Sequence, residues 1–398
     1  MTEKAVKPEI RFAGFNDAWE QRKAAELALY SKGNGYSKSD LTEVGIPIIL
    51  YGRLYTKYQF VINEVDTFAV PRSGAVYSQG NEVIIPASGE TAEDIARASA
   101  VEKSGILLGG DLNVLKPFEF INPLFLALAI SNGEPQKELA KKAQGKSVVH
   151  IHNSDIQEVS IAYPSRAEQD RIVGVFRNLD NLITLHQRKY DKLTKVKKSM
   201  LEKMFPKNGA NVPEIRFKGF SDAWEQRKLG EVVQITMGQS PDGSTYSDEP
   251  SDYILVQGNA DLQNGWVCPR IWTTEVTKKA DVGDLIMSVR APAGSMGKTA
   301  YNAVIGRGVA SIKGNEFIYQ LLVKMDTDGF WKTLSCGSTF ESLNSDNIKN
   351  AEIIIPSEEE QKQIGAFFCQ LDNLITLHQR ELEKLKNIKK ACLEKMFV

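Results

Sequence analysis

Two short segments contain residue types that could bind a phosphate or act in methyl transfer, and neither completes its motif. Residues 294–299, GSMGKT, resemble a phosphate-binding loop, but the motif needs a glycine five residues before Gly297, and that position is Pro292. Asn122-Pro123-Leu124 lacks the second proline and the aromatic residue of an amino-methyltransferase site. We therefore predict no catalytic residue and no nucleotide site in this chain.

Histidine and cysteine residues could ligate a metal, but their spacing does not form a ligand set. His150 and His152 stand two apart in a predicted strand, VVHIH, and no acidic or cysteine neighbour completes a site. A structural or solvent-facing pair is the simpler interpretation. No CxxC or CxxH spacing joins the four cysteines, which we expect to be buried thiols without a metal: Cys268, Cys336, Cys369 and Cys392.

Glycine-flanked clusters of polar and aromatic residues carry a clearer chemical signal. Arg, Gln, Asn, Ser and Glu side chains have the donors and acceptors that read base edges in the major groove of DNA, whereas Lys and Tyr suit phosphates. The DNA-binding candidates in the first half of the chain are Lys32, Tyr36, Lys38, Tyr51, Arg53, Tyr55, Lys57, Ser88, Glu90, Thr91 and Asp111. Those in the second half are Gln239, Ser240, Tyr246, Gln257, Asn259, Arg290 and Arg307. Ordinary turn chemistry with solvated side chains is the alternative explanation for these clusters.

Two segments of the chain occur twice, and they define its organisation. Residues 8–23, PEIRFAGFNDAWEQRK, reappear nearly unchanged at 213–228, and LDNLITLHQR at 179–188 reappears at 371–380. The second match continues to an LEKMF sequence in each copy. The chain therefore alternates constant and variable segments, and weak similarity between the variable stretches indicates one domain type whose surface has diverged.

The long constant segments predict helices, because their apolar residues recur at steps of about three and four, the period of a coiled-coil seam. We expect the first helix to run from about Arg166 to Lys203, roughly 55 Å at 1.5 Å per residue. A serine, Ser165 or Ser357, would cap each helix, with a glutamate three residues later as its capping-box partner. The predicted seam residues are Ile172, Leu179, Ile183, His186, Leu193, Ile364, Leu371, Ile375, His378 and Leu385.

Two matching seams can bury each other, so we predict that the helices pair antiparallel within the chain and separate the variable domains about a pseudo-two-fold axis. The alternative is that each seam packs only on its own domain. His186 and His378 occupy the same seam position and could hydrogen-bond to fix the register. Because the junction between the repeats resembles a fusion of the chain's end to its beginning, we also expect the termini to lie close together.

The variable segments alternate short β-rich runs with glycine-bearing turns, which indicates irregular domains with a strongly bent sheet. The predicted fold class is α+β: two globular recognition domains separated by a pair of long antiparallel coiled-coil helices, with a pseudo-two-fold internal repeat. Its predicted parts are a first recognition domain at 1–158, a first helical region at 159–208, a second recognition domain at 209–352 and a second helical region at 353–398.

Composition excludes some classes of protein. The 398 residues are 42% hydrophobic and 25% charged, which is typical of folded proteins, and no apolar run is long enough to span a bilayer. We expect a cytoplasmic protein. With a net charge of −1, any DNA contact depends on local basic patches, such as the Lys- and Arg-rich stretch at 188–207. Cations late in a helix also complement its dipole, so this stretch has a structural explanation as well.

The order of these segments resembles a known family. Two diverged domains alternate with two near-identical helical segments that carry PEIRFxGFxDAWEQRK, LDxLITLHQR and LEKMF. This arrangement is similar to the specificity subunit of type I restriction–modification systems over essentially the whole chain. The segments KGNGYSKSD, LYGRLYTKY, PASGETAEDIA and LGGDL resemble one class of its target-recognition domain, and GQSPDGSTY, QGNAD, SVRAPAG and IGRG resemble another.

The resemblance implies a function and a set of partners. Each variable domain would read one half of a bipartite asymmetric site in the major groove, and the helices would set the spacer and dock two modification subunits. The chain itself would be non-catalytic, with S-adenosylmethionine, ATP and magnesium expected only in the modification and restriction/translocase subunits. Double-stranded DNA and these subunits are the expected partners, and no membrane is.

Two other functions fit the same pattern. A stand-alone bipartite DNA-binding regulator would bind its site tightly without partners. A structural coiled-coil interaction protein would show no salt-dependent affinity for DNA, whereas a recognition subunit would lose affinity steeply as salt rises.

Overall fold

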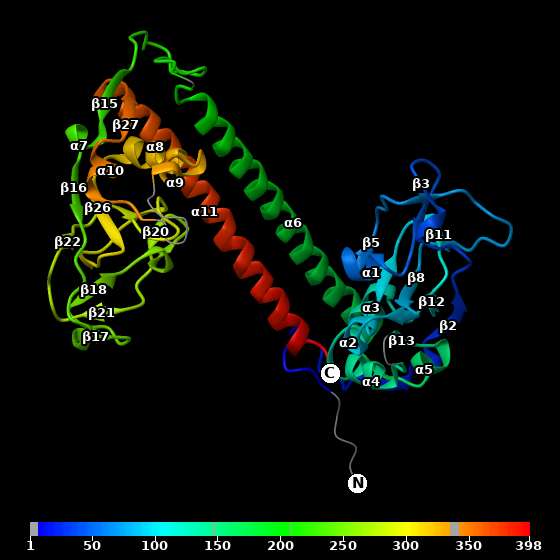
Figure 1. The fold of residues 1–398 in the computed structure, drawn as a ribbon. Helices are drawn as coiled ribbons and strands as arrows, with labels where there is room; N and C mark the ends of the chain where they lie inside the picture. Colours follow the sequence, from blue (N-terminus) through cyan, green and yellow to red (C-terminus); the bar gives the residue numbers. More distant parts are fainter. Residues whose placement is uncertain (1–6, 146–147, 208, 335–341) are drawn as a thin grey trace. The chain divides into compact units, whose positions relative to one another are not determined.

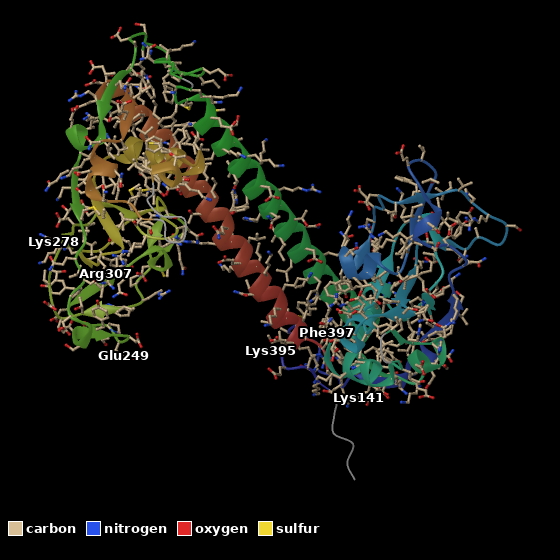
Figure 2. The ribbon with its side chains drawn as sticks, in the orientation of Figure 1. Lys141, Glu249, Lys278, Arg307, Lys395 and Phe397 are labelled. Atoms are coloured by element: carbon tan, nitrogen blue, oxygen red, sulfur yellow. The ribbon has the colours of Figure 1, made fainter. Side chains whose placement is uncertain are left out.

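The computed structural model describes residues 7–145, 148–207, 209–334 and 342–398, drawn as a ribbon in Figure 1 and with side chains in Figure 2. Within these ranges the chain forms two compact units. Unit 1 contains Met1–His186 together with Glu381–Val398, and unit 2 contains Gln187–Arg380. Each unit therefore combines one variable domain with parts of both long helical segments, whereas the division made from the sequence kept domains and helices apart.

The variable domain of unit 1 is built on two sheets, each with five strands among the described residues. The first has the strand order β2 (Ala28–Lys32), β12 (Leu112–Pro117), β8 (Glu82–Pro86), β10 (Ser99–Val101) and β5 (Val61–Ile62). The second has the order β3 (Leu41–Thr42), β6 (Phe68–Ala69), β4 (Ile46–Ile49), β11 (Ser104–Leu108) and β7 (Tyr77–Gln79). β8 is buried along its whole length and forms the centre of the domain.

The variable domain of unit 2 repeats this order. Its first sheet runs β16 (Gln234–Met237), β26 (Val309–Lys313), β23 (Leu285–Ser288), β24 (Met296–Lys298), β20 (Trp266–Val267) and β19 (Leu262–Gln263). Its second runs β17 (Tyr246–Ser247), β21 (Trp272–Thr273), β18 (Tyr253–Val256), β25 (Ala303–Ile305) and β22 (Lys279–Ala280). The parallel pairs also match, since β4 with β11 corresponds to β18 with β25. The prediction of one domain type in two diverged copies is confirmed.

A small antiparallel sheet precedes each long helix. β1 (Glu20–Lys23) pairs with β14 (Ser160–Tyr163) in unit 1, and β15 (Glu225–Lys228) pairs with β27 (Glu352–Ile355) in unit 2. β1 and β15 come from the short constant segments, whereas β14 and β27 lead into the helices. These sheets therefore tie the beginning of each repeat to the start of its long helix.

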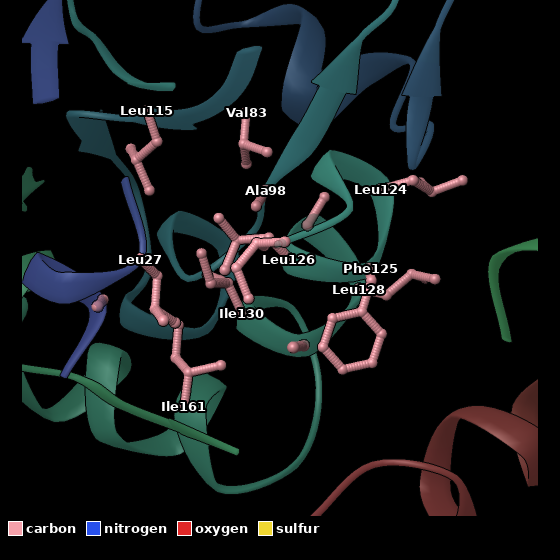
Figure 3. Close-up of a cluster of buried hydrophobic side chains, with 14 of the residues drawn as sticks. Leu27, Val83, Ala98, Leu115, Leu124, Phe125, Leu126, Leu128, Ile130 and Ile161 are labelled. Atoms are coloured by element: carbon pink, nitrogen blue, oxygen red, sulfur yellow. The ribbon is translucent and has the colours of Figure 1, made fainter. Parts of the chain in front are cut away.

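Short helices complete the two domains. α3 (Pro123–Ile130) is apolar and buried, and Figure 3 shows its side chains gathered with Val83 of β8, Leu115 of β12 and Ile161 of β14. α8 (Glu316–Thr327) follows β26 in unit 2 as α3 follows β12 in unit 1. The other short α-helices in the described ranges are α1 (Arg53–Thr56), α2 (Ala92–Ile95), α4 (Gly133–Lys142), α5 (Asn153–Gln157), α7 (Leu229–Val232), α9 (Phe330–Leu334) and α10 (Ser345–Lys349).

The constant segments form two long helices of 38 residues each, α6 (Arg166–Lys203) and α11 (Glu358–Lys395). The predicted limits of the first helix are confirmed. Neither helix contains proline, and Pro206 prevents α6 from continuing. An acidic residue in the first turn and a lysine in the last turn of each helix also complement the helix dipole.

The last turns of each long helix complete the core around the start of the other helix. In unit 1 Phe397, just past α11, is buried, and its ring centre lies 5.8 Å from that of Phe125 and 5.9 Å from that of Phe176 in α6. In unit 2 Phe205, just past α6, is buried with its ring centre 6.0 Å from that of Phe368 in α11. The helices therefore run antiparallel in both units. The alternative that each seam packs only on its own domain is wrong.

The predicted seam residues differ in burial along the helices. Those nearest the helix starts are buried, because the variable domain covers them together with the exchanged helix end: Ile172, Leu179, Ile364 and Leu371. The remaining seam residues are half-buried: Ile183, His186, Leu193, Ile375, His378 and Leu385. The helix starts therefore belong to the domain cores as much as to the seam.

An ion pair occurs at the same place in each copy of the repeat. In unit 1 Lys389 of α11 pairs with Asp180 of α6, and the lysine ammonium lies 4.6 Å from the centre of the Phe60 ring. In unit 2 Lys197 of α6 pairs with Asp372 of α11 at 2.6 Å. Each pair joins the start of one helix to the end of the other. Charge pairing therefore favours the antiparallel direction in both units.

Glu168 and Glu360 join the constant segments instead of closing a capping box. Each carboxylate is buried and accepts two hydrogen bonds from an arginine of the PEIRF sequence: Arg11 at 2.7 and 2.8 Å, and Arg216 at 2.7 Å for both bonds. Burial of these charges is tolerated because both carboxylate oxygens are paired. The serine half of the predicted capping box is present at Ser357, whose hydroxyl accepts the Glu360 N–H at 3.4 Å. The predicted role of the glutamate carboxylates is wrong, since the arginines bind them.

The segments at the two chain ends meet in unit 1. The Ile10 N–H donates to the Lys395 carbonyl at 3.0 Å, and Glu9 forms an ion pair with Lys395 at 3.2 Å. Unit 2 has the same backbone contact within the continuous chain, from the Ile215 N–H to the Lys203 carbonyl at 2.9 Å. The first described residues therefore lie beside the end of α11, as the repeat junction predicts, while residues 1–6 lie outside the described ranges.

Replacing Phe397 by alanine should lower the free energy of unfolding of unit 1 by about 3–5 kcal/mol, because a buried ring leaves a cavity. Phe205→Ala should have the same effect on unit 2. Denaturant unfolding measures the loss, and amide hydrogen exchange assigns it, with faster exchange in α3 for the first variant and in α8 for the second. Leu185→Ala, at a side chain 47% exposed, is the control and should change stability by less than about 0.5 kcal/mol. If Phe397→Ala left the free energy of unfolding unchanged, the helix end would not be part of the core.

Replacing Arg11 by methionine should cost about 3–5 kcal/mol, because it leaves the buried Glu168 carboxylate without a partner. Adding Glu168→Leu should recover most of that loss, since the unpaired charge is then removed. A double-mutant cycle in urea measures the coupling between the two side chains. Additive losses would contradict the pairing.

Candidate nucleic-acid interface

Four turns that contain the DNA-binding candidates converge in unit 1. Three backbone hydrogen bonds join them: Gly33 N–H to the Leu112 carbonyl at 3.0 Å, Gly109 N–H to the Ile49 carbonyl at 2.9 Å, and Ala87 N–H to the Asp111 carbonyl at 2.8 Å. Residues 32–38, 50–57, 87–91 and 109–111 therefore form the loop cluster of unit 1. The sequence placed these segments far apart, and the sheet topology brings them together.

Unit 2 has the same three bonds at corresponding positions. They are Gly238 N–H to the Val309 carbonyl at 2.9 Å, Gly306 N–H to the Val256 carbonyl at 2.8 Å, and Val289 N–H to the Gly308 carbonyl at 2.9 Å. These bonds assemble the loop cluster of unit 2, residues 238–246, 257–259, 289–290 and 306–308. Because Ala87 and Val289 correspond, the next residues, Ser88 and Arg290, occupy the same place in the two clusters.

Glycine is required where two of these turns cross. A Cβ on Gly33 would lie 1.9 Å from the Gly109 carbonyl oxygen, and one on Gly238 would lie 2.1 Å from the Gly306 carbonyl oxygen. Neither position can therefore carry a side chain without a backbone shift. The two units share this close approach, which explains why the candidate segments are rich in glycine.

Most candidates of unit 1 have exposed side chains: Lys32, Lys38, Tyr51, Lys57, Glu90, Thr91 and Asp111. Lys57 forms an ion pair with Asp66, and the Thr91 hydroxyl oxygen accepts the Asp94 N–H at 3.1 Å to cap α2. Asp111 has a φ of 55°, in the left-handed region, where an aspartate is tolerated at a tight turn. Lys32, Lys38, Tyr51, Glu90 and Asp111 are left as the candidates that are both exposed and uncommitted to these local bonds.

Four other candidates of unit 1 support the loops from within. Tyr36 is 7% exposed, and its hydroxyl bonds to two backbone groups. Arg53 donates to the Asp66 carboxylate at 3.0 Å. The Tyr55 hydroxyl donates to the Ser88 carbonyl at 2.5 Å, and burial raises the pKa of that hydroxyl, while the Ser88 side chain is itself 8% exposed. These side chains, two buried and two half-buried, hold the loop cluster in place.

In unit 2, Gln239, Arg290 and Arg307 are exposed, and Arg307 is labelled in Figure 2. The other candidates are half-buried and partly committed to the loops: Ser240, Tyr246, Gln257 and Asn259. The Ser240 hydroxyl accepts the Arg307 N–H at 3.1 Å, and the Tyr246 hydroxyl donates to the Pro241 carbonyl at 3.2 Å. The clearest outward-facing donors of unit 2 are therefore two arginines and a glutamine.

Sequence reasoning missed Asn34 of the unit 1 loop cluster and the position of His150 beside that cluster. Asn34 is exposed and corresponds to Gln239, since the backbone N–H groups of both bond to the end of a matching strand. His150 in β13 (Val149–His150) is exposed, and its Nδ1 lies 3.1 Å from the Ser88 Oγ. Alignment of GNG with GQS could have found Asn34. No local signal could have placed His150 beside a serine 62 residues away.

The segments closest to catalytic motifs have structural roles. GSMGKT contributes β24, and Lys298 bonds to the Glu316 carboxylate at 2.9 Å. Asn122 caps α3 by accepting the Leu124 N–H at 2.9 Å. His152 lies at the start of α5 and not in the strand that holds His150, so the prediction that both histidines lie in one strand is wrong.

The described residues contain no cluster of three His, Cys, Asp or Glu side chains that could hold a metal ion. Cys268, Cys369 and Cys392 are free thiols that are half-buried, so the prediction of buried thiols is wrong for these three. Burial raises the pKa of the Cys392 thiol, which packs against the unit 1 core. Cys336 lies outside the described residues.

Comparison with known families decides what this arrangement is. The family model for the type I restriction modification DNA specificity domain matches residues 16–195 and again residues 221–387. The chain belongs to this family. Its two matches fall on the two recognition domains and include most of both long helices. The protein is therefore a specificity subunit, and its role is to recognise a DNA sequence. This result favours the family interpretation over the regulator and the structural protein considered from the sequence.

Two relatives from Methanocaldococcus jannaschii are similar to this specificity subunit over most of its length. The protein named MjaX type I restriction enzyme specificity subunit is 27% identical over 376 residues, which are 90% of this chain and 83% of the relative. The MjaVIII specificity subunit is 23% identical over 344 residues, 79% of this chain and 77% of the relative.

Solved structures share the fold. The S subunit of a type I restriction–modification system from M. genitalium aligns over 99% of both chains with a TM-score of 0.67 and 15% identity. A second solved structure concerns the complex assembly and conformational transition of the type I restriction–modification system. One of its chains aligns over 95% of this chain and 97% of its own length, with a TM-score of 0.53 and 22% identity. The predicted class, α+β with two recognition domains and two long antiparallel helices, is confirmed.

None of the described helices combines the length and apolar character that a membrane crossing needs.

Replacing Gly238 by alanine should disrupt only the loop cluster of unit 2, because the new Cβ overlaps a carbonyl oxygen. We expect faster amide exchange at residues 238–246 and 306–308 and unchanged exchange at residues 32–38. Gly258→Ala is the matched control, since a Cβ there meets no atom within 4 Å. Equal effects of the two substitutions would contradict the steric explanation.

Proposed function

We propose that each unit of this specificity subunit reads one half of a bipartite, asymmetric DNA site through the major groove. One scaffold with two different sets of exposed side chains carries the proposal. The same backbone bonds hold both loop clusters, yet the exposed Asn34 of unit 1 corresponds to the exposed Gln239 of unit 2. The exposed Arg290 of unit 2 takes the place of Ser88, which is buried in unit 1. Such a pair is suited to reading two different short sequences.

The exposed side chains support an asymmetric site. Arg290 and Arg307 of unit 2 can each donate two hydrogen bonds to a guanine, the most common specific contact in the major groove. The exposed candidates of unit 1 include no arginine and offer instead the Glu90 carboxylate, which can accept from a cytosine amino group, with Lys32 and Lys38 suited to phosphates. The two half-sites are therefore expected to differ in sequence.

We propose that the two long helices set the spacer between the half-sites. α6 and α11 are each continuous for 38 residues, about 57 Å at 1.5 Å per residue. A continuous helix has a fixed length, so the number of unread bases would follow from the number of helical residues and not from base contacts.

We propose that each copy of the constant helical sequence docks one modification subunit. Leu182 and Leu185 on α6 are 43% and 47% exposed, and Leu374 and Leu377 at the same repeat positions of α11 are 45% and 52% exposed. Leucines three residues apart share a helix face, and large exposed apolar side chains favour coverage by a partner. Two equal sites would bind two copies of one subunit, and restriction/translocase subunits would join that complex.

The proposal gives this chain no catalytic role. S-adenosylmethionine would be bound by the modification subunits, and ATP and magnesium by the restriction/translocase subunits. The use of Lys298 and Asn122 in structural bonds supports this division of labour. The complex would act on double-stranded DNA in the cytoplasm.

Exchanging residues 24–157 for the first variable domain of a specificity subunit with another target should alter only one half of the recognised site. Cells that make the hybrid with its modification subunits would be tested by sequencing methylated adenines across the genome. The unexchanged half and the spacer should match those of the original protein. A change in both halves, or in neither, would refute separate reading by the two units.

A further inference from the structure

The duplicated constant segments have identical exposed side chains that packing does not explain. β1 and β15 both read EQRK, and all four side chains of each strand are exposed. Buried residues of the same segments, such as Trp19 and Trp224, are identical because they fill equivalent cores. The exposed side chains are held by fewer contacts: Lys23 and Lys228 bond to the segment before the partner strand, and the glutamate and arginine of each strand lie close to each other. The identity of the two exposed strands therefore points to a ligand that both of them bind.

Each strand borders a pocket with a shared lining. In unit 1 a cavity of about 410 Å³ is lined by Asp17, Glu20 and Arg22 together with Arg166, the first residue of α6, and the Pro-Ser pair before it. In unit 2 a cavity of about 690 Å³ is lined by the corresponding residues of the repeat: Asp222, Glu225 and Arg227, again beside the Pro-Ser pair and the start of the long helix. The repeat thus contributes the same group of lining residues to a pocket in each unit, although the unit 2 pocket is larger and has further charged residues, among them Lys313 and Lys362.

The two strands also have an edge that can accept another strand. β1 pairs with β14 and β15 pairs with β27, and no other strand in the described ranges pairs with either of them. The N–H and C=O groups along an exposed strand edge bind an extended segment, which then adds one strand to the sheet. The backbone therefore specifies an extended ligand, and the pocket specifies one of its side chains.

The charges of the pocket indicate that side chain. The shared lining has two carboxylates and one guanidinium. In unit 1 Arg22 lies 2.9 Å from the Glu20 carboxylate, which also accepts the Tyr163 hydroxyl at 2.9 Å. Arg166 also lines this cavity and is paired with Asp170 at 2.9 Å, while the neighbouring Arg11 is bonded to the Glu168 carboxylate and to the Asp17 main-chain carbonyl. The Asp17 carboxylate is then the one left for a ligand. A lysine or arginine side chain complements this pocket.

We propose that β1 and β15 each pair with the same extended segment of a partner subunit, and that a basic side chain of this segment enters the pocket beside Asp17 or Asp222. Two sites with one lining require two copies of one partner. The inference rests on the proposed function, in which the modification subunit is the partner present twice. The contact uses other residues than the exposed leucines on the helices and would add a second anchor for each subunit.

Amide hydrogen exchange on the full-length chain, alone and saturated with its modification subunit, tests the added strand directly. Residues 20–23 and 225–228 should both exchange at least 10-fold more slowly in the complex. Protection confined to the helices around residues 182–185 and 374–377 would overturn the inference while leaving the docking of modification subunits intact.

Charge reversal tests the pocket. Asp17→Lys combined with Asp222→Lys should weaken binding of the modification subunit at least 10-fold, and Asp17→Lys alone should reduce the tightly bound subunits from two to one. Asn16→Lys combined with Ser221→Lys is the matched control, because these exposed neighbours differ between the copies and are not part of the pocket lining. Thermal unfolding should show that all variants remain folded.

The outcomes separate the two proposals. If the unaltered chain binds no modification subunit, the proposed function fails. If it binds two and the Asp17→Lys, Asp222→Lys variant binds both with the same affinity as the control, only the pocket inference fails.

Discussion

The exchange of helix ends is the packing constraint on which the rest of the structure depends. Phe397 packs beside Phe125 of α3, and Phe205 packs beside Phe317 of α8 at 5.3 Å between ring centres. Neither variable domain has a complete hydrophobic core without the helix end that reaches it. Because one sequence, LEKMF, supplies both rings, the duplication in the sequence is also a duplication of this contact. The constant segments cannot diverge freely, whereas the exposed turns of the variable domains can.

The helices could be predicted from the sequence and the sheets could not. The seam period and the flanking prolines fixed Arg166–Lys203, because both signals are local. Strand order depends on contacts between distant segments, such as the parallel pair of β4 with β11, and no local pattern encodes them. The same reason explains the misassigned Glu168, whose partner Arg11 is 157 residues away.

The candidate interface could be located from the sequence but not resolved into individual contacts. Glycine at Gly33 and Gly238 marks turns that must cross closely, and these turns do assemble the two loop clusters. Whether a polar residue within a turn faces solvent depends on packing. Tyr36 points into the core and bonds to the backbone, while Arg290 is exposed. A shared scaffold held by backbone bonds lets the exposed residues change without loss of the fold, which suits a protein whose target sequence varies.

Guanine N7 methylation interference on the assembled complex tests the central claim most directly, since N7 lies in the major groove. The account predicts two separate groups of guanines at which methylation blocks binding, with insensitive bases between them. Arg290→Ala should remove interference from one group only. A single uninterrupted group, or loss of interference in both groups from that one substitution, would contradict the reading of two half-sites by two units.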